Sequence, residues 1–140
     1  DNGRTPMQWD ASNHAGFSKE TPWLPVHENH TTVNVANQEV DQNSVLHHFK
    51  KMVALRKDNL VFVYGKYKII QKEHPTVYAY SRTLDKQKMI ILLNFSETVS
   101  SINLLNLVQC KEVLINNYDH LTIEKNTATL QPYQAVILKF

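Results

Sequence analysis

The sequence is poor in the residues that build several common kinds of site. It has one cysteine, Cys110, and three glycines among 140 residues. A single cysteine cannot form an internal disulfide and is typical of a reducing compartment, so we expect a cytoplasmic protein. Three glycines leave little material for a phosphate-binding loop, and CxxC, HExxH and EF-hand patterns are absent from the sequence. We therefore predict neither a metal nor a cofactor.

Long hydrophobic runs and a strong charge of one sign are also absent. No apolar stretch approaches the ~20 residues that a membrane helix needs, and Lys plus Arg exceed Asp plus Glu by only 15 to 13. We therefore expect neither a membrane nor a nucleic-acid partner. No signal peptide opens the chain, but it begins at Asp1 without an initiator methionine. We expect that an N-terminal region has been removed.

The first third of the sequence lacks regular periodicity. Residues 1–43 show neither a helical nor a strand pattern and contain Pro6, Pro22 and Pro25. A structureless loop of this length is rare in a compact domain. Its large apolar side chains argue against a flexible tail, so we expect them to pack against another part of the protein. They are Met7, Trp9, Phe17, Trp23, Leu24 and Val26.

An amphipathic helix is predicted over 44–58. Apolar residues recur there at the spacings expected of a helix with one apolar face. Ser44 can cap the N-terminus, as can Asp41 or Asn43, and cationic residues occupy the last turn, where the helix dipole favours them. The apolar positions are Val45, Leu46, Phe49, Met52, Val53 and Leu55.

After Asn59 the sequence changes to short β-type runs separated by polar breaks. This pattern is typical of an antiparallel sandwich or barrel, and we expect seven or eight strands. Side-chain character alternates along residues 77–81, which indicates a strand with one solvent-exposed face. The continuous apolar run 89–93 indicates a central strand buried on both faces. The predicted strands are 67–70, 76–82, 88–95, 99–104, 112–115, 121–124 and 135–140.

Acidic residues and histidines were tested for catalytic and metal-binding patterns. A glycosidase needs two carboxylates about 5–10 Å apart across the scissile bond, and no local motif places such a pair. His27 and His30 lie in the aperiodic segment, and the adjacent His47 and His48 would point roughly 100° apart on a helix. We predict no catalytic residue and no metal ligand from these patterns.

The opening segment, residues 1–10, is the most informative part of the chain. It reads DNGRTPMQWD, and Arg4 lies between a turn-forming step and a Thr-Pro step, with Trp9 following. A guanidinium offers a planar fork of donors and an indole offers an aromatic face, a combination that suits sugar hydroxyls and pyranose rings. Arg4 is therefore the candidate substrate-binding residue. The alternative is a structural arginine that donates to loop carbonyls.

The same segment resembles family 13 glycoside hydrolases. DNGRTPMQWD, followed by NHAGFS, PWLPV and VNV, is similar to the stretch after the eighth barrel strand of oligo-1,6-glucosidases, dextran glucosidases, trehalose-6-phosphate hydrolases and sucrose isomerases. SVLHHFKKMVALRKDN resembles the eighth barrel helix, and VYGKYKII the start of the C-terminal β-domain. The resemblance covers essentially the whole chain, in order.

The resemblance implies a mainly β chain with two parts. Residues 1–59 would be the last βα loop and the eighth helix of a truncated (β/α)₈ barrel, and residues 60–140 an antiparallel β-sandwich, domain C. In similar enzymes an arginine in this region binds the terminal glucose, which supports Arg4. The aspartate nucleophile, the glutamate acid/base and the second aspartate of the retaining mechanism would all precede Asp1. No position of this sequence inherits a catalytic role.

The function implied is that of the C-terminal part of an α-glucosidase acting on short α-1,6- or α-1,4-linked glucosides. The chain is expected to be inactive without the remaining barrel of its polypeptide. The apolar face of the helix at 44–58 would then pack on the sandwich, on residues 1–43 or on a second copy. We therefore expect self-association, or disorder before about Gln42. The alternative function is a non-catalytic carbohydrate-binding or docking sandwich. We disfavour it because the tyrosines and phenylalanines mostly fall within strands, where we expect them to fill the core.

Overall fold

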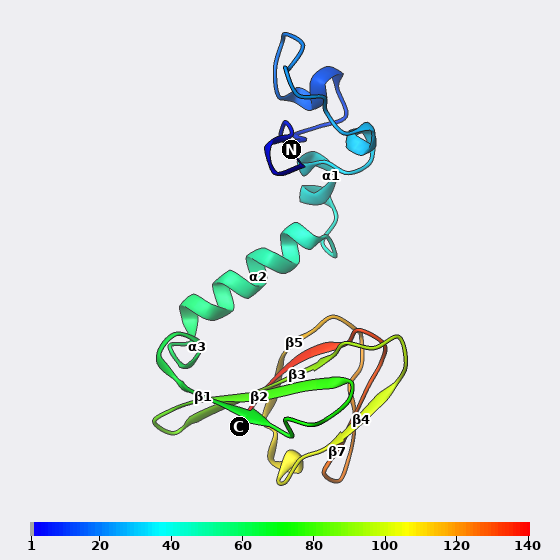
Figure 1. Cartoon of the computed structure of the whole chain (residues 1–140). Helices are drawn as coiled ribbons and strands as arrows, with labels where there is room; N and C mark the ends of the chain where they lie inside the picture. Colours follow the sequence, from blue (N-terminus) through cyan, green and yellow to red (C-terminus); the bar gives the residue numbers. More distant parts are fainter. Residues whose placement is uncertain (1) are drawn as a thin grey trace. The chain divides into compact units, whose positions relative to one another are not determined.

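The computed structural model describes residues 2–140. Figure 1 shows its helices and strands, coloured along the sequence from the N-terminus to the C-terminus. The chain divides into two compact units, the first ending at Asp58 and the second spanning Asn59–Phe140. Between residues 2 and 140, no helix combines the length and the apolar character needed to cross a membrane. The two units are described in turn.

The first unit consists of irregular loop, short helical turns and two helices. The α1 helix was missed by the sequence analysis, because six residues are too few to show a helical period. Asn34 caps it, with its side-chain oxygen accepting from the Asn37 amide at 2.8 Å. The elements are η1 Asn2–Arg4, η2 Asn13–Gly16, η3 Glu28–Thr31, α1 Val35–Val40 and α2 Val45–Asp58.

The long helix α2 confirms the prediction for 44–58. Ser44 acts as its N-cap, since the Ser44 hydroxyl oxygen accepts from the His47 amide at 3.2 Å. None of the α2 residues is buried, and Val45 and Phe49 remain 79% and 64% exposed. The apolar face that the sequence predicted is therefore present but largely uncovered in this chain.

The second unit is a β-sandwich of two antiparallel sheets, which confirms the predicted fold class. One sheet has five strands in the order β1-β2-β3-β8-β5, and the other has three in the order β4-β7-β6. The strands are β1 Lys66–Ile70, β2 Val77–Leu84, β3 Gln87–Asn94, β4 Ser100–Asn103, β5 Glu112–Asn116, β6 Thr122–Glu124, β7 Thr127–Leu130 and β8 Ala135–Lys139. Two short helical segments complete the unit, α3 Val61–Tyr64 and η4 Leu107–Gln109.

The core lies between the two sheets and combines side chains from both. β3 is the central strand of the larger sheet, and its residues 89–92 are all buried, as the continuous apolar run predicted. In β2, Val77, Ala79 and Ser81 are buried and their neighbours are not, which confirms the predicted alternation. The core residues are Val77, Ala79, Ile90, Leu92, Ile102, Leu104, Leu107, Ala128, Leu130, Val136 and Leu138.

One strand lies outside the predicted ranges. β7 pairs with both β4 and β6 and is the middle strand of the smaller sheet. Its Ala128 and Leu130 are fully buried. The sequence signal was weak because a four-residue strand with alternating threonines contains only one large apolar side chain.

The larger sheet has two edges, formed by β1 and β5. Each of these strands pairs with one neighbour only, β1 with β2 and β5 with β8. On β1 the exposed side chains include Lys66 and Lys68. On β5 the register with β8 shifts between Val113 and Ile115, as at a β-bulge.

Candidate substrate-binding loop

Arg4, the predicted substrate-binding residue, ends the η1 turn and is exposed. Its guanidinium carbon lies 5.9 Å from the centroid of the Trp23 ring, within the range of a cation–π contact. The structure thus brings together two residues that are 19 positions apart in an irregular segment. The sequence pattern gave no signal of this proximity, since neither helical nor strand periodicity connects them.

Four large apolar side chains of the same loop are exposed in this chain. Trp23 is 81% exposed, and Met7, Trp9 and Phe17 are each 50% exposed. Leu24 and Val26 are partly buried, and the expectation that the whole set packs against another part of the protein stays a prediction. Of these four side chains, Trp23 is the one that contacts Arg4.

The loop that carries Arg4 is closed by hydrogen bonds around Asp10. The Asp10 carboxylate accepts from the Ser12 amide at 2.8 Å and also from the Ser12 hydroxyl. The hydrogen bond from the Ser12 side chain, followed by that from its backbone, lowers the pKa of Asp10 below the ordinary 3.8. Asp10 is therefore held as an anion that braces the loop, which does not suit a proton donor at neutral pH.

A left-handed backbone segment faces this aspartate. His14, Ala15 and Gly16 have φ values of 54°, 56° and 65°, and Ala15 is completely buried. The Ala15 carbonyl accepts from the amides of Trp9 and Asp10, at 2.9 and 3.3 Å. A Cβ atom at Gly16 would lie 2.6 Å from a carboxylate oxygen of Asp10, so only glycine fits there without displacing the carboxylate.

Gln8, four residues after Arg4, is hydrogen-bonded to the η3 region and to the start of α1. The Gln8 side-chain amide donates to the Asn29 side-chain oxygen at 3.1 Å and to the Val33 carbonyl. The Gln8 carbonyl accepts from the Val35 amide at 3.0 Å, next to the Asn34 cap. The segment following Arg4 is therefore anchored on two sides, which limits the conformations that this part of the loop can adopt.

We predict that Gly16→Ala will loosen the loop. The alanine must adopt a left-handed φ, which costs about 1 kcal/mol, and its Cβ displaces the Asp10 carboxylate from Ser12. The pKa of Asp10 should then rise toward 3.8, measured by carboxyl ¹³C NMR during an acid titration. Because a lowered carboxyl pKa stabilises the folded loop above pH 3.8 and is lost on acidification, the variant should lose less stability as the pH falls.

Gly3→Ala is the matched control for this prediction. A Cβ at Gly3 meets no atom within 4 Å, and its φ is not positive. The control should leave the pKa of Asp10 unchanged. An equal change in both variants would show that Gly16 has no special role in holding Asp10.

Three histidines of the first unit make hydrogen bonds to nearby backbone groups. The His27 ring nitrogen Nδ1 accepts from the Asn29 amide at 3.2 Å, and His30 Nδ1 lies 3.1 Å from the His27 carbonyl oxygen. His47 Nδ1 lies 2.9 Å from the Asp41 carbonyl oxygen. Across residues 2–140, no three histidine, cysteine or acidic side chains cluster as a metal site would require.

The tyrosines of the second unit contradict the expectation that they fill the core. On the β1–β2 side of the larger sheet, the Tyr80 ring lies 5.4 Å from Tyr67 and 5.5 Å from Tyr78, tilted by 39° and 44°. The Tyr67 and Tyr78 hydroxyls are hydrogen-bonded at 2.7 Å. Five of the six tyrosines are exposed: Tyr64, Tyr67, Tyr78, Tyr118 and Tyr133. The rings are not coplanar, so they form a cluster rather than a flat sugar platform.

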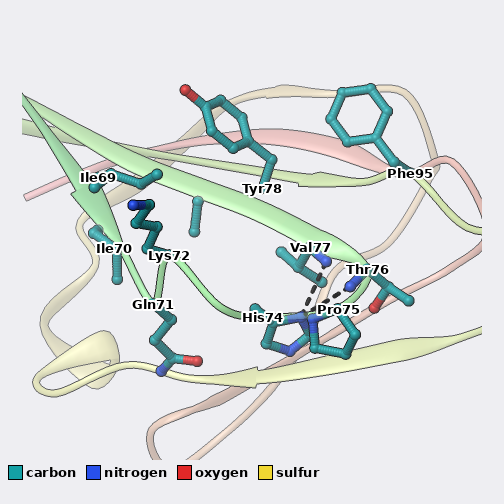
Figure 2. A pocket seen from close by; sticks show the side chains of 11 residues that line it. Ile69, Ile70, Gln71, Lys72, His74, Pro75, Thr76, Val77, Tyr78 and Phe95 are labelled. Carbon is teal, nitrogen blue, oxygen red and sulfur yellow. Dashed lines mark hydrogen bonds between the residues drawn. The ribbon is translucent and has the colours of Figure 1, made fainter.

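A hollow of about 170 Å³ adjoins the connection between β1 and β2 (Figure 2). Figure 2 shows the Tyr78 and Phe95 rings on one side of the strand and His74 with Gln71 on the other. His74 Nδ1 accepts from the Val77 amide at 3.0 Å, and its Nε2 lies 3.1 Å from the Ser101 carbonyl oxygen. Both ring nitrogens of His74 thus contact backbone groups, one in β2 and one in β4. We therefore give His74 a structural role at this hollow.

Two family models match successive parts of the chain. Residues 1–65 match the model of the α-amylase catalytic domain, and residues 77–137 match that of the α-amylase SusG C-terminal domain. The oligo-1,6-glucosidase of Parageobacillus thermoglucosidasius is 42% identical over 99% of this chain. The chain belongs to the α-amylase family. The resemblance to family 13 glycoside hydrolases that the opening motif indicated is thereby confirmed.

Further relatives of this α-amylase-family chain are named for different activities. The trehalose-6-phosphate hydrolase of Bacillus subtilis is 35% identical over 99% of the chain. Among solved structures, the trehalose-6-phosphate hydrolase of Bacillus licheniformis matches 99% of the chain with 31% identity and a TM-score of 0.89. A trehalulose synthase MutB variant, F164L, matches all of it with 32% identity and a TM-score of 0.91.

The chain spans about a quarter of the length of the relatives that it matches. It covers 25% of the Parageobacillus and Bacillus subtilis proteins and 26% of each of the two structures. The family models place a catalytic-domain segment first and a C-terminal domain second.

Proposed function

We propose that this chain supplies the last loop, the last helix and the C-terminal sandwich of an α-glucosidase that hydrolyses short α-1,6- or α-1,4-linked glucosides with retention. The observation that carries the proposal is the match to oligo-1,6-glucosidases along nearly the full chain. In this proposal residues 1–59 complete a (β/α)₈ barrel and residues 60–140 form domain C.

Arg4 is the substrate-binding residue of the proposal. Its exposed guanidinium can donate two parallel hydrogen bonds to the hydroxyls of a terminal glucose. The loop that carries it is braced by Asp10 and anchored through Gln8, so Arg4 would be presented on an ordered support. The catalytic carboxylates would come from the rest of the polypeptide, and no residue of this chain is assigned a catalytic role.

The proposed partners are an α-glucoside oligosaccharide and the remaining barrel of the same polypeptide. Val45 and Phe49 of α2 are exposed and would be covered by neighbouring barrel elements, or by a second copy of the chain when it is studied alone. The free cysteine, Cys110, fits a cytoplasmic location for the whole protein.

A chimera tests the proposal directly. Joining this chain to the preceding three quarters of the Parageobacillus thermoglucosidasius oligo-1,6-glucosidase should give a protein that hydrolyses isomaltose and p-nitrophenyl α-glucoside. The 140-residue chain alone, and the bacterial portion alone, should show no turnover. A well-folded but inactive chimera, or turnover by the chain alone, would contradict the proposal.

The exposed tyrosines favour examining a second candidate, a non-catalytic carbohydrate-binding sandwich. The reason for disfavouring it from sequence was the expected burial of these rings, and that expectation was wrong. The tilted arrangement of Tyr67, Tyr78 and Tyr80 still lacks the flat surface on which a pyranose ring stacks. Calorimetric titration of the chain with maltose and isomaltose separates the two candidates. Millimolar or tighter binding that Tyr78→Ala abolishes would favour the carbohydrate-binding sandwich.

A further inference from the structure

A second hollow, the β1 hollow, has a volume of about 780 Å³ and lies within the second unit beside the edge strand β1. The smaller sheet is narrower than the larger one, and its edge strand β4 packs against β2, so β1 extends past it. The Gln71 side-chain amide donates to the Asn103 carbonyl and ties the end of β1 to the end of β4. The β1 hollow is therefore bounded by the sandwich itself, and its volume falls in the range of about 300–1,000 Å³ typical of small-molecule sites.

Three lysines line the β1 hollow, and two of them lie on the face of β1 that points toward the smaller sheet. Lys68 pairs in register with Ser81, a buried residue on the core face of β2, and Lys66 pairs with Thr83 on the same face. Thr83 pairs in turn with Lys88 of β3. Because register partners share a face, two strand spacings place the α-carbons of Lys66 and Lys88 about 10 Å apart, with Thr83 between them.

The β1 hollow carries positive charge without a compensating acid. No aspartate or glutamate among residues 2–140 lines it. The other lining residues include Ser81 and Thr83, which have hydroxyl groups, and the apolar Ile90, Leu104 and Leu105. Cations gathered in one concavity repel one another, and an anion that enters it relieves the repulsion. The charge and the apolar lining together suit an anion with an apolar part.

Protection of the sheet edge explains only part of this arrangement. Inward-pointing charges on an edge strand discourage pairing with a foreign strand, and Lys66 and Lys68 fit that role. Lys88 does not, because β3 lies between β2 and β8 and has no free edge. The Lys88 ammonium lies 5.5 Å from the centroid of the Phe140 ring, a cation–π contact that limits its freedom, and Lys88 still lines the hollow.

We propose that the β1 hollow binds a small organic phosphate, a phosphate monoester whose organic part is apolar. A phosphate monoester carries a charge of about −1.5 to −2 at pH 7 and has three strong acceptor oxygens, which suits a group of ammonium donors. The lysines hold the phosphate group, and the apolar lining residues contact the organic part. The inference goes beyond the proposed function and does not depend on it.

Calorimetric titration of the 140-residue chain with phenyl phosphate tests the site, because this probe joins a phosphate monoester to an apolar ring. We expect saturable binding with a Kd of about 1 mM or below in about 150 mM NaCl, where screening suppresses weak non-specific attraction. Phenol, which lacks the phosphate, should not bind, and inorganic phosphate, which lacks the ring, should bind about fivefold more weakly. No saturable binding up to about 20 mM phenyl phosphate, or equal affinity for phenyl and inorganic phosphate, would overturn the proposal.

Substitution of the lysines separates a built site from general charge. Lys66→Gln combined with Lys68→Gln should raise the Kd for phenyl phosphate by about tenfold, and Lys88→Gln alone by about fivefold. The matched control combines Lys72→Gln with Lys111→Gln, which removes the same charge from exposed lysines of the second unit outside the β1 hollow. The control pair should leave the Kd within about twofold of the parent. Equal weakening by the two pairs would show that only net charge matters and would overturn the proposal.

A ¹⁵N correlation spectrum of the parent chain locates the bound probe without any substitution. Amide shifts should concentrate at residues 66–71 and 81–83, and shifts confined to other residues would contradict the site. In the chimera, the Lys66→Gln and Lys68→Gln pair should weaken phenyl phosphate binding by the same factor. A chimera whose binding ignores this pair would show that the added barrel covers the hollow, which overturns the proposal. Hydrolysis of isomaltose by the chimera decides separately on the proposed function.

Discussion

Arg4→Ala is expected to lower kcat/KM of the chimera for isomaltose by about a hundredfold. The proposal gives Arg4 two charge-assisted hydrogen bonds to the terminal glucose, and a hydrogen bond to a charged group contributes about 1.5–3 kcal/mol. Because each 1.4 kcal/mol corresponds to about a factor of ten, the loss of the guanidinium should be visible in ordinary initial-rate measurements. Thermal unfolding of the variant should be nearly unchanged, since Arg4 is exposed.

Two further variants sharpen this result. Arg4→Lys keeps the positive charge but loses the planar fork, so it should retain part of the activity and fall between the parent and Arg4→Ala. Lys19→Ala removes an exposed cation from the same loop and should have no effect on kcat/KM. If Lys19→Ala and Arg4→Ala reduce activity equally, Arg4 acts through the general charge of the loop rather than by binding the sugar.

Leu138→Ala is expected to lower the free energy of unfolding of the second unit by about 3 kcal/mol, the middle of the range for a buried leucine. Leu138 is fully buried, and its register partner across the β3–β8 ladder is Ile90, another member of the core. In a unit of this size the unfolding midpoint should fall by roughly 12–24 °C.

The distribution of aromatic residues allows the unfolding of each unit to be followed separately. All six tyrosines lie after Asn59 and both tryptophans before Asp58, so near-ultraviolet circular dichroism of tyrosine reports on the second unit and tryptophan fluorescence on the first. Leu105→Ala is the control, because Leu105 is 84% exposed and the same atoms are removed. Equal midpoints for the two variants would show that the inter-sheet core does not limit the stability of the sandwich.

The parts of the fold that the sequence could predict are those with a strong local period. The α2 helix shows its apolar positions at helical spacing, and β2 and β3 differ clearly in their alternation. α1 and β7 are too short for a period to emerge, so they were missed. A periodic pattern predicts an element only when that element is long enough to show the period.

The site shows a different limit. Alternation along β2 places Tyr78 and Tyr80 on the face opposite Val77, but it does not say whether that face is covered, and the tyrosines were wrongly assigned to the core. The motif made Arg4 a candidate, and that role stays a prediction, whereas the contact of Arg4 with Trp23 depends on the path of an irregular loop. A contact of this kind carries no periodic signal in one sequence.

The two edges of the larger sheet bear on how the chain behaves at high concentration. A foreign strand that adds to β1 must align beside Lys66 and Lys68, and one that adds to β5 meets an interrupted ladder between Val113 and Ile115. Lysines and bulges at such positions are the usual protection against amyloid-like growth by edge-to-edge pairing. The larger sheet is thus guarded against polymerisation through its backbone. Association between copies is expected to proceed through exposed apolar side chains such as Phe49, in a reversible and concentration-dependent manner.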